Sequence, residues 1–283
     1  MLKAFDNTAL RRAMDLARET LDIEADALRA LHARLAEDDS VGRAVGMLLG
    51  CSGRVVVSGI GKSGHIARKI AATLSSTGTP AMFVHPAEAA HGDLGMVTAE
   101  DAFIAISYSG EAAELLSILP IVKRMGAPLI AMTGKPQSSL AQLADVHLNI
   151  AVEKEACPLN LAPTASTTAT LALGDALAVA LLDARGFREE DFARSHPGGA
   201  LGRRLLTHVR DVMRSGDAVP MVTADVPLAA ALLEITQKGM GMTAIVDAAG
   251  YPVGVFTDGD LRRMLEKVQD FTKVAIRDVM HAS

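Results

Sequence analysis

Hydrophobic and polar positions follow two patterns along the chain, and together they predict a sheet covered by helices. Short apolar runs rich in Val, Ile and Phe alternate with longer stretches in which apolar residues recur every three or four positions. The first pattern is typical of buried strands and the second of amphipathic helices. We expect a doubly wound α/β fold with a parallel five-stranded sheet, helices on both faces, and strands at residues 55–57, 81–84, 102–107, 128–133 and 146–150.

Helical periodicity is strongest in three places. Residues 8–36 carry apolar residues among paired charges, which predicts one or two amphipathic helices of the kind that pack on a neighbouring subunit. A helix is predicted over residues 111–125, between the third and fourth strands. Residues 164–184 are almost wholly Ala, Leu, Val and Thr, so this helix is expected to be buried or to contact another subunit. A turn within residues 195–204 then precedes a short helix.

The C-terminal part of the chain has a repeat of its own. Asp211-Val212-Met213 recurs 67 residues later as Asp278-Val279-Met280, with a predicted helix, two short strands around residues 247–251 and a helix from Asp258 between them. We therefore expect a helical segment at 1–40, the main α/β domain at 41–206, a smaller α+β repeat at 207–270 and, at 271–283, the opening of a second, truncated repeat.

The segment from Gly53 to Gly64 is predicted to form a strand, a tight glycine loop and a helix from Gly64. It fails as a nucleotide phosphate loop, because the opening glycine would fall at Val56. Its glycines fit a dinucleotide fingerprint, which also needs an acidic residue about 20 positions on, but His85 follows the second strand. Nicotinamide binding and a purely structural glycine turn are alternatives to a phosphate or carboxylate site at the helix start.

Three strand ends offer hydroxyl groups, glycines and free backbone amides. Because ligands of parallel sheets bind beyond the carboxyl ends of the strands, these segments predict a phosphate or sugar site. Lys62 would supply positive charge, and Glu114 is a better functional candidate than Glu111, which we expect to cap the start of the 111–125 helix. The candidate binding residues at these ends are Ser63, Ser107, Ser109 and Thr133.

Three further positions carry candidate chemistry. Residues 85–95 concentrate His85, Glu88, His91 and Asp93, whose spacing matches no zinc module, so we expect a polar loop that contacts substrate hydroxyls and binds metal adventitiously at His85. Glu155 follows the fifth strand, where a base is needed. His196, in the turn before Pro197, can move protons near neutral pH.

Composition narrows the class of protein. The chain has 283 residues, is 49% hydrophobic and has a net charge of −5. We find no run long enough to cross a bilayer, no secretory signal and no basic stripe for nucleic acid. Cys51 and Cys157 fit a reducing cytoplasm and are expected to be small packed residues. These features predict a cytoplasmic protein without membrane or nucleic-acid partners.

The combination of segments resembles the D-arabinose 5-phosphate isomerases, in which a flavodoxin-like sugar isomerase (SIS) domain precedes cystathionine-β-synthase-type (CBS) repeats. The chain departs from that family in lacking most of a second repeat and in having Tyr108 where a smaller polar residue is expected. The matching stretches are residues 59–65, 75–80, 85–96, 107–114, 154–161, 164–175, 195–203 and 256–263.

The resemblance implies interconversion of D-ribulose 5-phosphate and D-arabinose 5-phosphate, a step towards the octulosonate (Kdo) sugar of lipopolysaccharide. It implies a homotetramer with sites shared between subunits, no required cofactor, an inhibitory zinc ion at His85, and a nucleotide or sugar-nucleotide effector at the repeats. The implied catalytic residues are Lys62, Glu114, Glu155 and His196, and the implied substrate contacts are Gly78, Thr79, His85 and His91.

Moving a carbonyl between C1 and C2 needs a carbon base and a shuttle for the hydroxyl proton. In our hypothesis Glu155 is the carbon base, and His196 opens the ring or carries the hydroxyl proton. Lys62 stabilises the negative charge as it develops, and Glu114 orients Lys62 or His196. The alternatives are an isomerase of another sugar phosphate and a non-catalytic phosphosugar sensor.

Overall fold

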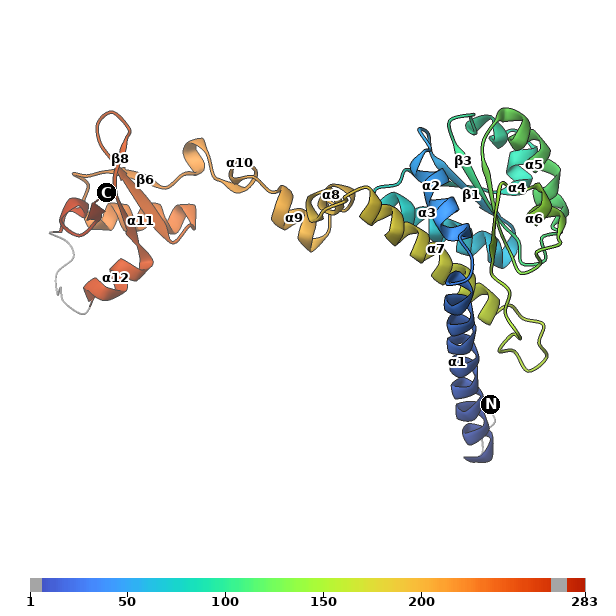
Figure 1. Ribbon diagram of the computed structural model, residues 1–283. Helices are drawn as coiled ribbons and strands as arrows, with labels where there is room; N and C mark the ends of the chain where they lie inside the picture. The colour runs from blue at the N-terminus through green and yellow to red at the C-terminus, as the bar shows by residue number, and fades with distance from the viewer. Residues whose placement is uncertain (1–6, 266–273, 283) are drawn as a thin grey trace. The chain divides into compact units, whose positions relative to one another are not determined.

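The computed structural model describes residues 7–265 and 274–282. The chain divides into two compact units, Met1–Leu206 and Thr207–Ser283, and each is described by itself below (Figure 1).

The N-terminal unit is built on a parallel five-stranded sheet with the strand order β2-β1-β3-β4-β5. The predicted strands are confirmed to within two residues, the largest difference being at β1, where pairing with β3 continues through Ser58 and Gly59. The strands are β1 (Val55–Gly59), β2 (Ala81–Val84), β3 (Ala102–Ile106), β4 (Leu129–Thr133) and β5 (Val146–Asn149).

Helices cover both faces of this sheet, as predicted for a doubly wound fold (Figure 1). One face is covered by α2 (Ser40–Leu49), which was not predicted, α3 (Gly61–Ser76) and α7 (Ala165–Ala184). The other face is covered by α4 (Pro86–Ala90), α5 (Ala113–Met125) and α6 (Ser139–Leu143). Successive strand residues point to opposite faces, so that Val55 and Val57 join the first cluster and Val56 the second.

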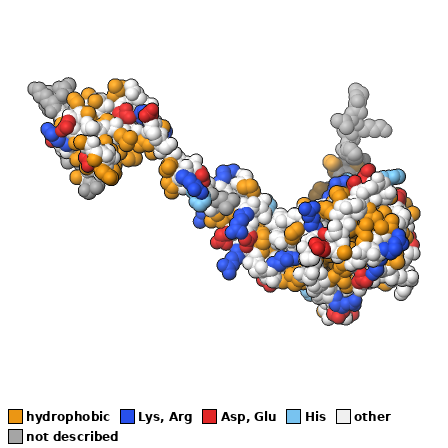
Figure 2. All heavy atoms as spheres, turned by 90° about the horizontal axis from the view of Figure 1, so that it is seen from above, with side chains coloured by type: hydrophobic (Ala, Val, Ile, Leu, Met, Phe, Trp, Pro, Cys, Tyr) orange, Lys and Arg blue, Asp and Glu red, His pale blue; other side chains and the backbone are white. Residues whose placement is uncertain are grey.

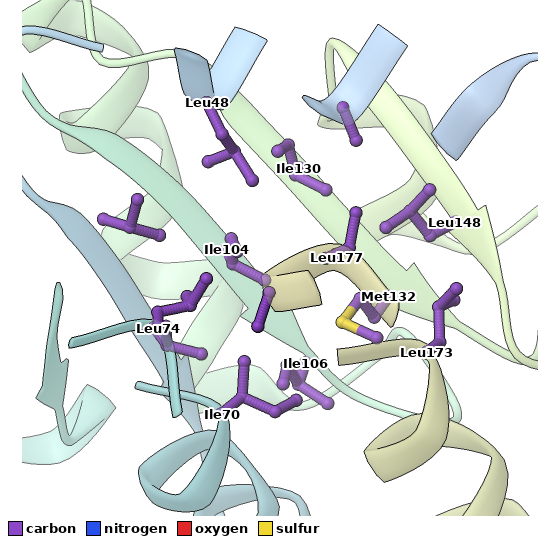
Figure 3. Packing of buried hydrophobic residues seen from close by; sticks show 14 of the residues in the cluster. Leu48, Ile70, Leu74, Ile104, Ile106, Ile130, Met132, Leu148, Leu173 and Leu177 are labelled. Carbon is purple, nitrogen blue, oxygen red and sulfur yellow. The ribbon is translucent and has the colours of Figure 1, made fainter. Parts of the chain in front are cut away.

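The first cluster is the larger core, and α7 lies against α3 within it. Figure 3 shows Ile70 and Leu74 of α3 facing Ile104 and Ile106 of the sheet, and Leu173 of α7 lying beside Met132 of β4. Burial of such side chains is worth about 1.5–3 kcal/mol each. This packing fixes the starts of α3 and α7, and both starts border the candidate site.

Helix α7 corrects one expectation from the sequence. Its 20 residues are long and apolar enough to cross a bilayer, so the statement that no run is long enough was wrong. Half of the helix is buried inside the protein, where Leu173, Leu177 and Leu181 are at most 1% exposed. The prediction of a buried apolar helix at this position is confirmed.

The remaining helices of this unit lie before the first strand and after α7. The segment predicted to hold one or two helices forms one continuous helix, α1 (Asn7–Leu35), of which Ala27 and Leu31 are buried while Leu10, Met14 and Leu21 are exposed. Arg34 at its end donates hydrogen bonds to the carbonyl oxygens of Asn149 and Ala151, 2.7 and 3.0 Å away. After α7 come α8 (Glu189–Ser195), which was not predicted, and the predicted short helix, α9 (Ala200–Leu206).

The C-terminal unit contains a mixed four-stranded sheet with the order β6-β7-β8-β9. The predicted helix, strand pair and second helix are confirmed, with Leu228, Ile245 and Phe256 fully buried among them. The elements are α10 (Val209–Val212), η2 (Gly216–Ala218), β6 (Met221–Thr223), α11 (Leu228–Lys238), β7 (Met242–Val246), β8 (Pro252–Thr257), α12 (Asp258–Leu265), η3 (Ile276–Asp278) and β9 (His281–Ala282).

Strand β9 comes from the segment expected to open a second repeat, and it pairs with β8 of the first. The first copy of the Asp-Val-Met sequence, residues 211–213, lies at the end of α10, and the second copy, residues 278–280, lies at the end of η3. The expected boundary at residues 270–271 lies outside the described residues.

Candidate active site

The candidate site begins where β1 passes into α3. The helix starts at Gly61, three residues earlier than predicted, because Ile60 already has the extended backbone of an N-cap. Lys62 and Ser63 therefore lie in the first turn, beside backbone amides that have no partner within the helix. Gly64 allows the first turn of α3 to lie close to the end of β1, since a Cβ there would lie 2.7 Å from the carbonyl oxygen of Gly59.

Serine side chains shape the neighbouring turn after β3. Ser107 Oγ accepts from the backbone N–H of Gly110 at 3.1 Å, and Ser109 Oγ accepts from that of Glu111 at 3.2 Å. Gly110 has a φ of +69°, and a Cβ there would lie 2.0 Å from Ser138 Oγ. Only glycine fits this turn, which holds both serines at the end of the strand.

These two segments and the start of α7 enclose a cavity of about 330 Å³, here called the Lys62 cavity. The starts of two long helices carry partial positive charge, and together with Lys62 and several hydroxyls they suit a phosphate group. The structure thus brings together Lys62, Ser63, Ser107 and Ser109, as the sequence predicted. The hydroxyls of α7 were missed, because its apolar composition indicated only burial. The lining residues are Ile60, Lys62, Ser63, Ile66, Ser107, Tyr108, Ser109, Ala112, Pro163, Ser166, Thr167 and Thr170.

The face of the N-terminal unit shown in Figure 2 carries positive and negative side chains interspersed with apolar ones. A single basic stripe does not form among the described residues visible on that face. Lys62 is the charged side chain among the residues that line the Lys62 cavity.

Thr133 lies at the end of β4 but outside the lining of the Lys62 cavity. It is fully buried, and its hydroxyl donates to the carbonyl oxygen of Lys135 at 3.0 Å and lies 2.9 Å from His147 Nε2. Burial lowers the pKa of His147, although a hydrogen bond from the imidazole to the backbone carbonyl of Thr133 raises it, so the neutral imidazole is favoured. The sequence did not predict the contact between Thr133 and His147, because a single histidine in an apolar strand does not indicate its partner.

Glu155 is held at the start of α7 by hydrogen bonds to both of its carboxylate oxygens. Its Oε2 accepts from Thr164 N at 2.8 Å, Thr164 Oγ1 at 3.1 Å and Ser166 N at 3.1 Å, and its Oε1 accepts from Ser166 Oγ. Burial raises the pKa of this carboxyl, but the hydrogen bonds outweigh that effect and leave the pKa below its usual value. Glu155 is therefore an ionised carboxylate one side chain away from the Lys62 cavity, through Ser166.

The two acids after β3 have different surroundings. Glu111 was expected in the first turn of the helix that follows, and this was wrong, because α5 begins only at Ala113. Its carboxylate accepts from the N–H and hydroxyl of Ser139 at 2.7 and 2.8 Å, so it caps α6 instead. Glu114 lies exposed in the first turn of α5, two residues beyond the cavity-lining Ala112.

The histidine-rich segment is partly helical and not the loop that we expected. His85 is the N-cap of α4, where its Nδ1 accepts from the N–H of Ala87 at 3.3 Å, and His91 follows the same helix. A proline at the first helical position, Pro86, explains this short helix. Among the described residues, no three His, Cys, Asp or Glu side chains come together as a metal site.

The other predicted residues lie apart from the Lys62 cavity in the described part of one chain. Gly78 and Thr79 precede β2, at the amino end of the sheet, where the Thr79 hydroxyl accepts from Arg185 Nε at 3.1 Å. His196 ends α8, with its ring stacked on Phe192 at a centroid distance of 4.1 Å. The roles of these residues stay predictions.

Comparison with known proteins identifies both units. Residues 48–180 match the SIS domain and residues 209–267 match the CBS domain. Arabinose 5-phosphate isomerase KdsD of Pseudomonas aeruginosa is 58% identical over 264 residues, which are 93% of this chain and 80% of the relative. KdsD of Escherichia coli K12 is 56% identical over 263 residues with the same coverage.

A solved structure agrees with these matches. The c3406 protein of Escherichia coli CFT073, in complex with arabinose 5-phosphate, is 44% identical, covers 68% of this chain and 100% of its own, and superposes with a TM-score of 0.63. With its SIS fold, its CBS unit and this level of identity, the chain belongs to the arabinose 5-phosphate isomerase (KdsD) family.

Proposed function

We propose that the chain is an aldose-ketose isomerase that interconverts D-ribulose 5-phosphate and D-arabinose 5-phosphate through an enediol. The observation that carries this proposal is the Lys62 cavity, where Lys62, serine hydroxyls and two helix starts suit a sugar phosphate. The proposal is also supported by the 56–58% identity between this chain and two KdsD enzymes, over 93% of the chain. The product would feed the synthesis of the Kdo sugar of lipopolysaccharide in the cytoplasm.

The chemistry of such an isomerase assigns roles to the candidate residues. Lys62 stabilises negative charge on the enediolate oxygens, and Glu155 exchanges the carbon proton between C1 and C2. His196 opens the sugar ring or carries the hydroxyl proton, and Glu114 orients Lys62 or His196. The reaction requires no redox cofactor, because the carbonyl only changes places with a hydroxyl on the neighbouring carbon.

We propose that a homotetramer completes the site. Glu155 lines a separate cavity of its own chain and reaches the Lys62 cavity through Ser166. Glu114, His85, His91 and His196 do not line the Lys62 cavity in the described structure, so a neighbouring subunit supplies some of them, together with the Gly78–Thr79 turn. The exposed apolar residues of α1, Leu10, Met14 and Leu21, offer a surface for this contact. Zinc at His85 inhibits, and a nucleotide or sugar nucleotide regulates through the CBS unit.

The experiment is a ¹³C NMR time course of the purified protein with D-ribulose 5-phosphate, with and without a chelator. We expect arabinose 5-phosphate to appear in both samples, and Glu155→Gln to slow its formation by about 10²-fold or more, as expected for loss of a catalytic base. Lys62→Met should lower turnover as well, because it removes the charge at the helix start.

The outcomes separate the proposal from its alternatives. A wild-type protein that binds the sugar phosphate without converting it would indicate a sensor. Conversion of another sugar phosphate in preference to this pentose would indicate a different isomerase. Loss of activity with the chelator would contradict an inhibitory role for the metal.

A further inference from the structure

We propose that Ser166 is a positioning residue for this isomerase, whose hydroxyl holds the Glu155 carboxylate in its working orientation from within the wall of the substrate cavity. The inference rests on the proposed function and deepens it, because it concerns how the same site keeps its base in place. Ser166 stands out among the cavity-lining residues as the one that both borders the Lys62 cavity and bonds to Glu155 in the described structure.

The two oxygens of Glu155 are held unequally. Oε2 accepts from the hydroxyl of Thr164 and from the backbone N–H groups of Thr164 and Ser166. The Ser166 hydroxyl is the sole donor to Oε1 among the hydrogen bonds of the described residues. Losing that hydroxyl leaves three anchors on one oxygen and none on the other, so the carboxylate can rotate about its anchored side.

Ser166 is itself rigidly placed. The residue is 2% exposed, and its carbonyl oxygen accepts from Thr170 Oγ1 at 2.7 Å, one turn further along α7. Its backbone N–H bonds to the same carboxylate as its hydroxyl does. A side chain fixed in this way transfers the position of the buried helix α7 to Glu155 and so pre-organises the base.

The hydroxyl also keeps Glu155 able to accept a proton. Burial favours the neutral acid, and the donors at the start of α7 favour the ionised form, with the Ser166 hydroxyl the strongest of them. A carboxylate must be ionised before it can take a proton from carbon. Removal of this one donor should therefore raise the pKa of Glu155.

The test compares the pH dependence of kcat and KM in the full-length wild type, Ser166→Ala, Ser166→Thr and Thr167→Val. Thr167 is the matched control, because it lines the same cavity from the same helix while its hydroxyl donates to the carbonyl oxygen of Thr164 and not to Glu155. In Ser166→Ala we expect kcat to fall about tenfold or more and its acid limb to move towards neutrality by about one pH unit. KM should change little, because Lys62, Ser63, Ser107 and Ser109, to which the phosphate site is assigned, are untouched.

Ser166→Thr keeps the hydroxyl and should restore both kcat and the acid limb. Thr167→Val can change KM, but it should leave the acid limb where the wild type has it. In the Glu155→Gln background, Ser166→Ala should cost no further activity, because a positioning residue acts through the group that it holds. Circular dichroism and thermal unfolding of each variant establish that it is folded before its kinetics are interpreted.

The results distinguish failure of the positioning role from failure of the proposed function. An active wild type with an unmoved acid limb in folded Ser166→Ala, or an additive loss in the double variant, would overturn the positioning role alone. A wild type without turnover would overturn the proposed function and this role with it. The second case is recognised at once, because it appears before any variant is compared.

Discussion

At the scale of single residues, Tyr108 joins three parts of the candidate site. Its ring packs so closely on Gly134 that a Cβ there would lie 2.5 Å from the ring. Its hydroxyl accepts from the N–H of Val152 at 3.2 Å, three residues before Glu155, and the residue lines the Lys62 cavity. The family resemblance led us to expect a smaller polar residue here, and the structure shows that the larger one ties the turn after β3 to the segment that carries Glu155.

Tyr108→Phe keeps the ring and removes only the hydroxyl. We expect it to lower the free energy of unfolding by about 0.5–1.5 kcal/mol, since the Val152 N–H loses its partner, and to raise the B-factors of residues 152–157. Urea unfolding and a crystal structure of the variant measure the two effects. Unchanged stability together with an unmoved 152–157 segment would show that the hydroxyl does not secure it.

Cys157 is expected to be the more reactive of the two cysteines. Backbone N–H groups of the following turn, Ala162 first among them, lower the pKa of its thiol, and the thiolate is the nucleophile. Cys51, in contrast, donates its S–H to the carbonyl oxygens of Glu100 and Arg54.

Limited iodoacetamide at pH 7, followed by peptide mass mapping, should label Cys157 before Cys51. Cys157→Ser serves as the control and should leave only slow labelling. Equal rates at the two cysteines would mean that the backbone amides do not activate the thiol.

At the scale of elements, the close contact of α3 and α7 depends on one glycine. A Cβ on Gly174 would lie 2.3 Å from Cδ1 and 2.4 Å from Cγ1 of Ile70, a fully buried residue of the main core. On α2, by contrast, a Cβ on Gly46 would meet nothing within 4 Å. The two glycines therefore provide a matched pair of helix positions.

Both Gly→Ala changes gain about 1 kcal/mol in helix propensity, but only Gly174→Ala adds atoms to a filled core. We expect Gly46→Ala to be neutral or stabilising, and Gly174→Ala to be less stable than it by about 1–3 kcal/mol. Chemical unfolding of the two variants under the same conditions gives this difference directly. Equal stabilities would show that Ile70 moves aside without cost.

The sequence predicted an element where the residues of that element alone show a recognisable hydrophobic pattern. The five strands and α7 were predicted because each is a continuous apolar segment whose pattern needs no partner to be recognised. Helix α4 was missed because its five residues are too few to show a period. The start of α3 was placed late because glycines at Gly61 and Gly64 carry no hydrophobic signal, although they begin a helix here.

The site was predicted unevenly for a related reason. Residues at strand ends, such as Lys62 and Ser107, follow from topology, because the carboxyl ends of parallel strands share one edge. The contact between Ser166 and Glu155 depends on the path of the loop that returns α7 to that edge, and no local pattern specifies this path. The same holds for Glu111, whose partner Ser139 lies 28 residues further along the chain.

At the scale of the whole molecule, two compact units with separate cores should give two thermal transitions. In the C-terminal unit, Asp260 links the end of β8 to β9. Its carboxylate accepts from Thr257 N at 2.9 Å and Thr257 Oγ1 at 2.7 Å, and lies 2.7 Å from His281 Nε2. Burial raises the pKa of Asp260, but these bonds and one from Arg263 outweigh it and hold the pKa far below its usual value.

A carboxyl whose pKa is lower in the folded than in the unfolded state stabilises the fold at any pH above its unfolded-state pKa, which is about 3.9 for Asp. This stabilisation is lost progressively as the pH falls from the unfolded-state pKa towards the folded-state pKa. Differential scanning calorimetry of the full chain between pH 7 and pH 3 should therefore show the C-terminal transition falling steeply below about pH 4.5. Asp260→Asn should lower that transition at pH 7 and flatten its acid dependence. Asp225→Asn is the control, because Asp225 pairs with Arg277 on the surface with its side chain 84% exposed, and such pairs are worth little. If the two variants had the same transition temperatures, the buried carboxylate would not be what secures β9 to the first repeat. If only Asp260→Asn lowers the C-terminal transition, the segment carrying His281 is an integral part of this unit.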